Sequence, residues 1–162
     1  MAEFENSIGK SNEWYTPPEI FKALNCEFDL DPCSPGKGHW VPAKEIYTKE
    51  DDGLSKDWEH KFVFMNPPFG GRNGHIPWLE KFIENKNGIG VCRSYTSSAW
   101  FQKYIPLMDI CLFPKGKTKF VRPDGTIGRA PGHGIVLVGI GQKAMYHIIH
   151  SNLGLITKFY RF

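Results

Sequence analysis

Short apolar runs alternate along the chain with segments whose apolar residues recur at helical spacing. The run at residues 62–65 has no charge and no polar alternation, which is typical of a strand buried on both faces of a parallel sheet. At residues 26–31, apolar and acidic residues alternate, which indicates a half-buried strand. Similar runs predict further strands at 43–48, 89–93, 110–113, 134–140 and 155–160.

Apolar residues spaced three and four apart predict helices over residues 75–87, 97–105 and 142–151. A shorter helix is expected to begin at Thr16-Pro17-Pro18-Glu19, which has the form of a capping box with proline at the first helical position. The order of strands and helices predicts one compact α/β domain over residues 1–162, in which a mostly parallel sheet has an antiparallel edge. Residues 1–12 are polar and are expected to be flexible.

Length and composition exclude several classes of protein. At 162 residues and 18.5 kDa, the chain can bury a single core. No apolar stretch approaches the ~20 residues of a membrane-spanning helix, and the acidic start is unlike a signal peptide. The cysteines have no framework spacing, which predicts free thiols in a reducing cytoplasm. Cys26, Cys33 and His39 could be imagined as zinc ligands, but a CxxC pair and a fourth ligand are missing, so no metal site is predicted.

The tetrapeptide Asn66-Pro67-Pro68-Phe69 directly follows the buried run at 62–65. Ligands of open α/β sheets bind at the carboxyl ends of the strands, where this tetrapeptide would lie. Two prolines make the segment stiff and leave carbonyl oxygens without neighbouring N–H groups. Asn66 adds an acceptor and Phe69 adds a flat apolar face, a combination suited to a planar amine such as a nucleobase. The alternative is a proline-rich loop without a function.

The same arrangement occurs in methyltransferases that modify exocyclic or amide nitrogens, and methyl transfer needs a donor such as S-adenosylmethionine. Asp29 and Asp31 lie at a strand end before Gly36-x-Gly38, where a carboxylate could meet the donor's ammonium group or ribose diol. Asp52 follows about twenty residues later and could meet the ribose or the adenine amine. The helix start at Thr16-Pro17 offers positive dipole character for the donor's carboxylate. Solvated aspartates, a polar turn and a simple helix cap are the alternatives.

Several segments, taken in order, resemble the phage-type DNA N-6-adenine methyltransferases. The resemblance covers roughly residues 13–140, and the matching segments are Glu13–Phe21 with its Trp-x-Thr-Pro pattern, Phe28–Pro32, Asp51–Leu54 with Trp58, Val63–Phe69, and Trp78. It implies a Rossmann-like class I methyltransferase fold, S-adenosylmethionine as the donor, and adenine in double-stranded DNA as the acceptor. It also implies a cytoplasmic location in a bacterial host and donor-binding roles for Tyr15, Thr16, Pro17, Asp29, Asp31, Pro32 and Asp52.

The chain departs from the family pattern at two places. Phe69 stands where the family often has Tyr, which keeps the stacking face and loses only a hydroxyl. Only about thirty residues separate the Asp31 strand from the strand at 62–65, which is short for the usual two strand–helix units. The implied catalytic residues are Asn66, Pro67, Pro68 and Phe69, with the flipped-out adenine stacked on Phe69.

A basic segment follows in the last third of the chain. Asp124 is the one acidic residue in this segment. The basic residues could neutralise DNA phosphates, and they are Lys115, Lys117, Lys119, Arg122 and Arg129. An ordinary solvated hairpin is the alternative. The same tetrapeptide also serves enzymes that methylate RNA bases or protein glutamine, and a non-catalytic DNA-binding relative would keep the fold. The basic segment favours nucleic acid over protein as the partner.

Overall fold

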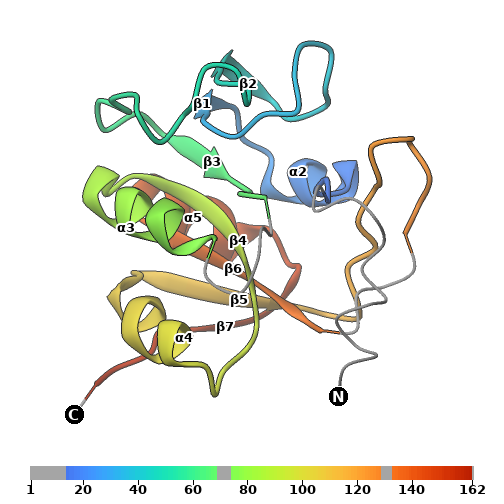
Figure 1. Cartoon of the computed structure of the whole chain (residues 1–162). Helices are drawn as coiled ribbons and strands as arrows, with labels where there is room; N and C mark the ends of the chain where they lie inside the picture. Colours follow the sequence, from blue (N-terminus) through green and yellow to red (C-terminus); the bar gives the residue numbers. More distant parts are fainter. Residues whose placement is uncertain (1–13, 69–73, 129–132, 162) are drawn as a thin grey trace.

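The structure is a computed structural model that describes residues 14–68, 74–128 and 133–161. Its centre is a seven-stranded sheet in the order β2-β1-β3-β4-β6-β5-β7 (Figure 1). The strands are β1 (Phe28–Asp31), β2 (Ala43–Ile46), β3 (Val63–Met65), β4 (Gly88–Arg93), β5 (Ile110–Pro114), β6 (Ile135–Ile140) and β7 (Gly154–Thr157). The helices are α2 (Pro18–Leu24), α3 (Ile76–Asn85), α4 (Ala99–Tyr104), the 3-10 helix η1 (Ile105–Leu107) and α5 (Gln142–His150).

The sheet has a parallel half and an antiparallel half. β1 pairs in parallel with β2 and β3, and β3 pairs in parallel with β4. β6 pairs antiparallel with β4 and β5, and β7 pairs antiparallel with β5. The α/β class is therefore confirmed, but the antiparallel part is larger than the expected edge. The physical reason is that β6 lies between β4 and β5 and runs opposite to both.

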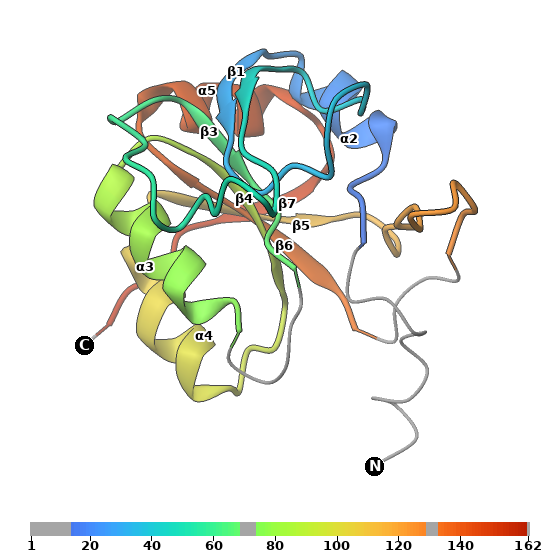
Figure 2. The same cartoon turned by 45° about the horizontal axis from the view of Figure 1, so that its top comes forward.

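Helices cover both faces of the sheet (Figure 2). α2 and α5 pack on one face, against a buried cluster that includes Phe62 and Phe64. α3 and α4 pack on the other face, against a cluster that includes Val63 and Met65. All of β3 is buried, as its uninterrupted apolar run predicts. β3 lies between the two helical layers, and the chain leaves the core at the carboxyl end of this strand.

The start of α2 differs from the prediction. The helix begins at Pro18 with Pro17 at the N-cap, and no side chain caps it. The predicted capping box is therefore wrong, because the Thr16 hydroxyl bonds Asn66 instead. The expected turn at Pro123-Asp124-Gly125 is present and closes a hairpin, in which the Arg122 N–H donates to the Thr126 carbonyl at 2.9 Å.

The expected flexible segment, residues 1–12, lies outside the described residues. Among the helices that the structure describes, none is both long and apolar enough to span a bilayer.

Candidate active site

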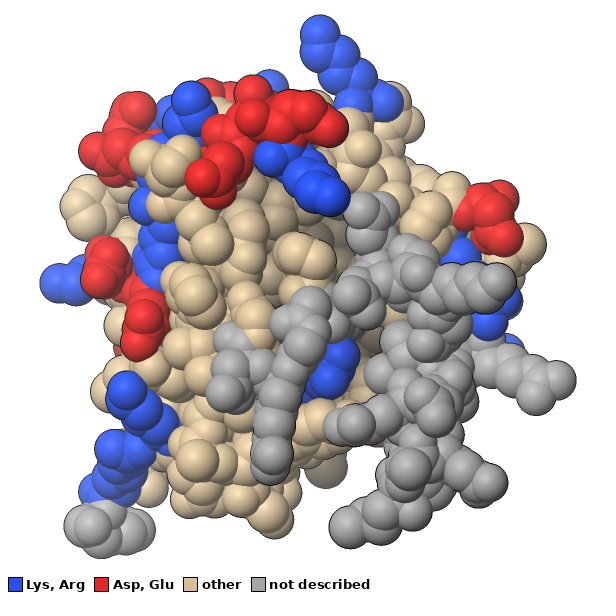
Figure 3. Space-filling view, viewed as in Figure 1, with Lys and Arg blue, Asp and Glu red and all other residues tan. Residues whose placement is uncertain are grey.

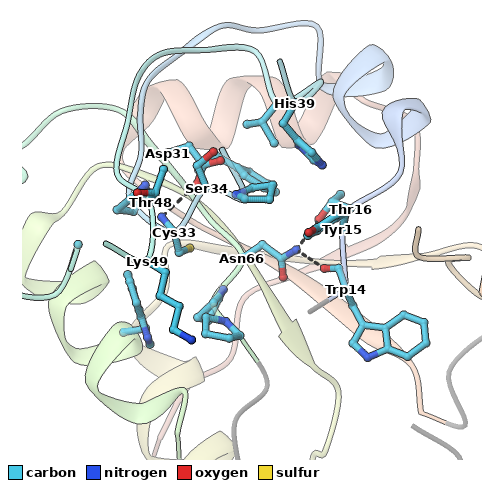
Figure 4. A pocket seen from close by; sticks show the side chains of 18 of the residues that line it. Trp14, Tyr15, Thr16, Asp31, Cys33, Ser34, His39, Thr48, Lys49 and Asn66 are labelled. Atoms are coloured by element: carbon cyan, nitrogen blue, oxygen red, sulfur yellow. Dashed lines mark hydrogen bonds between the residues drawn. The ribbon is translucent and has the colours of Figure 1, made fainter. Parts of the chain in front are cut away.

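A cavity of about 430 Å³ opens at the carboxyl ends of β1 and β3 (Figure 4). Segments far apart in the chain line it: residues 14–16, 31–35, 48–49, 52–53 and 66–68, together with His39, Val41, Phe64 and Trp78. Gly53 brings the loop after β2 against β1, since a Cβ added there would lie 1.9 Å from the Pro32 carbonyl oxygen. The volume lies within the range of roughly 300–1,000 Å³ that is usual for small-molecule sites.

Asn66 follows the last residue of β3 and lies in the cavity wall. Its Nδ2 donates to the Trp14 carbonyl oxygen at 2.8 Å and to the Thr16 Oγ1 at 3.1 Å. Its Oδ1 is buried and has no hydrogen-bond donor in the described part of the chain. An unsatisfied buried acceptor costs about 1–3 kcal/mol, and native structures keep one only for a reason. The free oxygen therefore points to a ligand that donates a hydrogen bond.

Asp31 is the last residue of β1 and is only 2 % exposed. Its Oδ1 accepts a hydrogen bond from the Cys33 N–H at 3.2 Å, and the Ser34 side chain bonds it as well. Burial raises the pKa of the Asp31 carboxyl to about 7, although the bonds from Cys33 and Ser34 lower it. Among the described residues, Asp31 forms no ion pair with a basic side chain. The carboxylate is suited to a cationic group that enters the cavity.

His39 lines the cavity beside a cluster of aromatic rings. Its ring stacks on Trp40 at 3.9 Å and meets the edge of Tyr15 at 4.7 Å between ring centroids. Trp40 holds the cluster to the chain, because its Nε1 donates to the Thr16 carbonyl oxygen at 2.8 Å. Both nitrogens of His39 are buried without a partner among the described residues, and burial lowers the pKa of the ring. A neutral imidazole with an unpaired donor and acceptor is suited to a polar ligand.

A basic hairpin, residues 115–128, lies beside this cavity wall. Tyr15 and Val121 exchange two backbone hydrogen bonds of 2.9 Å. The Arg122 guanidinium lies 5.6 Å from the centre of the Trp14 ring. In Figure 3, Lys and Arg side chains are visible on the right, where the hairpin projects, beside an acidic side chain, and others are spread over the rest of this face. The lysines at 115, 117 and 119 are exposed.

Comparison with known proteins is consistent with this geometry. The sequence profile of the family described as DNA N-6-adenine-methyltransferase (Dam) matches residues 6–137. The chain belongs to this family. It is also similar to a DNA N-6-adenine-methyltransferase of Haemophilus phage HP1, with 28% identity over 110 residues. That alignment covers 62% of this chain and 61% of the length of the relative. No solved structure matches the chain.

The family residues implied by the sequence have different places in the structure. Those that line the cavity together are Tyr15, Thr16, Asp31, Pro32, Asp52, Asn66, Pro67 and Pro68. Pro17 lines a separate hollow, between the start of α2 and the basic hairpin. Phe69 and Arg129 lie outside the described residues.

Asp29 is not among the residues that line the cavity. It lies two residues before the end of β1, and at about 3.3 Å per residue this places it roughly 7 Å from the strand end. Its Oδ1 accepts from Lys44 Nζ at 3.1 Å, and its Oδ2 accepts from the Phe62 N–H at 3.0 Å. Asp29 therefore helps to hold β1 to the neighbouring segments of the sheet, and it lies outside the cavity.

Sequence reasoning missed several polar side chains of the cavity: Ser34, His39, Thr48 and Lys49. His39 was considered only as a zinc ligand, and within the described ranges no group of three or more metal-binding side chains is found. Lys49 lines the cavity from the loop after β2 (Figure 4). Its position beside Asp51-Asp52 carries no pattern that distinguishes it from a solvated turn lysine.

Proposed function

We propose that this protein is a DNA adenine-N6 methyltransferase that uses S-adenosylmethionine as its methyl donor. The family match supports the reaction class. The observation that carries the proposal is the Asn66 Oδ1, an acceptor without a partner in the described chain at the wall of a 430 Å³ cavity. The parallel arrangement of β2, β1, β3 and β4, with the cavity at their carboxyl ends, supports the finer assignment of a Rossmann-like class I fold.

The residues of the cavity fit the donor. S-adenosylmethionine, when bound, supplies an activated methyl group. Asp31 offers a buried carboxylate for a cationic or hydroxyl group, and Asp52 offers a second carboxylate from the facing loop. Tyr15, Pro32 and His39 add apolar surface and ring nitrogens to the wall. These residues would bind and orient the donor.

Asn66 and Pro67 would act on the adenine. The Asn66 Oδ1 and the Pro67 carbonyl oxygen accept hydrogen bonds from the exocyclic amine, which orients its lone pair and stabilises the positive charge that develops on nitrogen. A covalent enzyme intermediate is unnecessary for this reaction. Because the amine is inaccessible inside a duplex, the adenine must leave the base stack, and Phe69 is the proposed ring on which it stacks.

The basic hairpin would bind the DNA backbone next to this site. Lys115, Lys117 and Lys119 are exposed, and the hairpin is joined to the cavity wall through Tyr15. Their charges can neutralise phosphates on either side of the displaced nucleotide. This arrangement favours nucleic acid over a protein substrate.

A methyl-transfer assay tests the proposal. The purified protein is incubated with labelled S-adenosylmethionine and, in parallel, with double-stranded DNA, RNA and a protein extract. We expect label only in the DNA, and N6-methyladenine after digestion to nucleosides. Label in RNA or protein would support the alternative substrates instead. Donor binding without any transfer would support a non-catalytic relative.

A further inference from the structure

We propose that Thr16 is a positioning residue for Asn66 and that residues 14–16 connect Asn66 to the basic hairpin. This inference rests on the proposed function, since it concerns the group that receives the adenine amine. It gives Thr16 a different role from a helix cap or a direct donor contact.

The orientation of the Asn66 amide follows from its partners. The Trp14 carbonyl oxygen can only accept, so the atom 2.8 Å from it must be the Nδ2. The Thr16 Oγ1, at 3.1 Å, accepts from the same Nδ2. Thr16 is 2 % exposed, so water cannot readily replace its hydroxyl. With both bonds made, the Oδ1 remains as the free acceptor that the proposed reaction requires.

Residues 14–16 are in turn held by the basic hairpin. The paired hydrogen bonds between Tyr15 and Val121 fix the backbone directly after the Trp14 carbonyl group, and the bonded Tyr15 N–H belongs to the same peptide unit as that carbonyl. The Trp14 ring packs on Gly128, where an added Cβ would lie 2.6 Å from the ring carbon Cζ3. Contacts therefore run without interruption from the proposed phosphate-binding segment to the Asn66 amide. A shift of the hairpin would move the groups that orient Asn66.

The variants Thr16→Val and Thr16→Ser test the first part. Valine keeps the shape of threonine and removes the acceptor, whereas serine keeps the hydroxyl. At saturating donor and DNA, we expect a methyl-transfer rate constant about 10-fold or more lower for Thr16→Val, which is ~1.4 kcal/mol of lost positioning. Thr16→Ser should recover most of that rate. Dissociation constants for donor and DNA should stay within about threefold of wild type, as a positioning role predicts.

Two results would overturn the role of Thr16. One is wild-type transfer by Thr16→Val; the other is weaker donor binding with an unchanged rate constant at saturation, which would make Thr16 a donor contact. A second measurement tests the positioning role of Thr16 even if the wild type methylates no DNA. Exchange of the Asn66 side-chain amide protons, followed by NMR, should accelerate in Thr16→Val and stay slow in Thr16→Ser. Equal exchange in all three proteins would refute the positioning role irrespective of activity.

The variant Gly128→Ala tests the connection to the hairpin. The new methyl group would collide with the Trp14 ring, at a position that does not line the donor cavity. We expect a lower rate constant at saturating donor and DNA, and faster exchange of the Asn66 amide protons. A wild-type rate constant together with wild-type exchange would show that the hairpin and Asn66 are independent.

Discussion

Asp31→Asn should stabilise the donor-free protein at high pH and weaken its binding of the donor. The pKa of this carboxyl rises from 3.8 to about 7 on folding, chiefly because burial disfavours the charged form. One pKa unit corresponds to about 1.4 kcal/mol, so an ionised Asp31 in the folded protein costs ~4 kcal/mol of unfolding free energy. An asparagine avoids that cost. Its buried NH₂ group needs an acceptor, however, and an unpaired one costs about 1–3 kcal/mol. The net gain at pH 8 should therefore be about 1–3 kcal/mol.

The direction of the pKa shift of Asp31 determines the pH range over which it changes the stability of the protein. Between pH 4 and pH 7 the folded protein keeps the Asp31 proton and the unfolded chain has lost it. The stability of the wild type should fall as pH rises through this window, and the loss should be complete above pH 7. Asp31→Asn removes this dependence. Urea unfolding of both proteins at a series of pH values measures it, and the advantage of the variant should shrink toward pH 4.

Donor binding provides the second measurement. A cationic group placed beside Asp31 favours the carboxylate, so binding near pH 6 should release a proton from the wild type. Calorimetry in buffers of different ionisation heat detects that proton, and Asp31→Asn should bind the donor more weakly without releasing it. Asp29→Asn is the matched control, because it removes a carboxylate of β1 outside the cavity and should leave donor affinity unchanged. A variant less stable than wild type at pH 8, or one with unaltered donor affinity, would refute this reasoning.

Three further variants test other parts of the site. Asn66→Ala should abolish methyl transfer and leave donor binding largely intact, as measured by calorimetry; normal turnover would remove Asn66 from the catalytic assignment. His39→Phe keeps the aromatic stack and removes the ring nitrogens, so donor affinity should fall about 10-fold with little change in the rate at saturation; equal affinity would make the unpaired nitrogens irrelevant to binding. Replacing Lys117 and Lys119 by glutamine should weaken DNA binding and reduce its salt slope by about 2, and an identical slope would exclude both from phosphate contact.

Local patterns in the sequence were sufficient for most of the secondary structure. The uninterrupted apolar run of β3 and the helical spacing in α3 and α5 are short-range patterns, which can be recognised without knowledge of tertiary contacts. The position of Asn66-Pro67-Pro68 at a strand end follows from the same local reading. The pairing order did not, because β6 enters between β4 and β5 through contacts between distant segments.

The distinction between Asp29 and Asp31 depended on tertiary structure. Both are acidic residues of β1, yet only Asp31 lines the cavity. Asp29 lies two residues earlier in the strand, where it accepts hydrogen bonds from Lys44 and from the Phe62 N–H. Thr16 shows the same dependence. Its sequence neighbours predict a helix cap, while its hydroxyl bonds a residue fifty positions away. His39 had no recognisable pattern, because its unpaired nitrogens become significant only once the chain has buried them in a cavity wall.

The sequence by itself therefore determined which segments are strands and helices, and which tetrapeptide follows the buried strand, because these properties depend on neighbours a few residues apart. Only the tertiary structure decided which polar groups share the cavity and which atom of Asn66 is left free. Those properties depend on hydrogen-bond partners and burial contributed by distant segments such as 14–16 and 115–128, and local sequence carries no record of them.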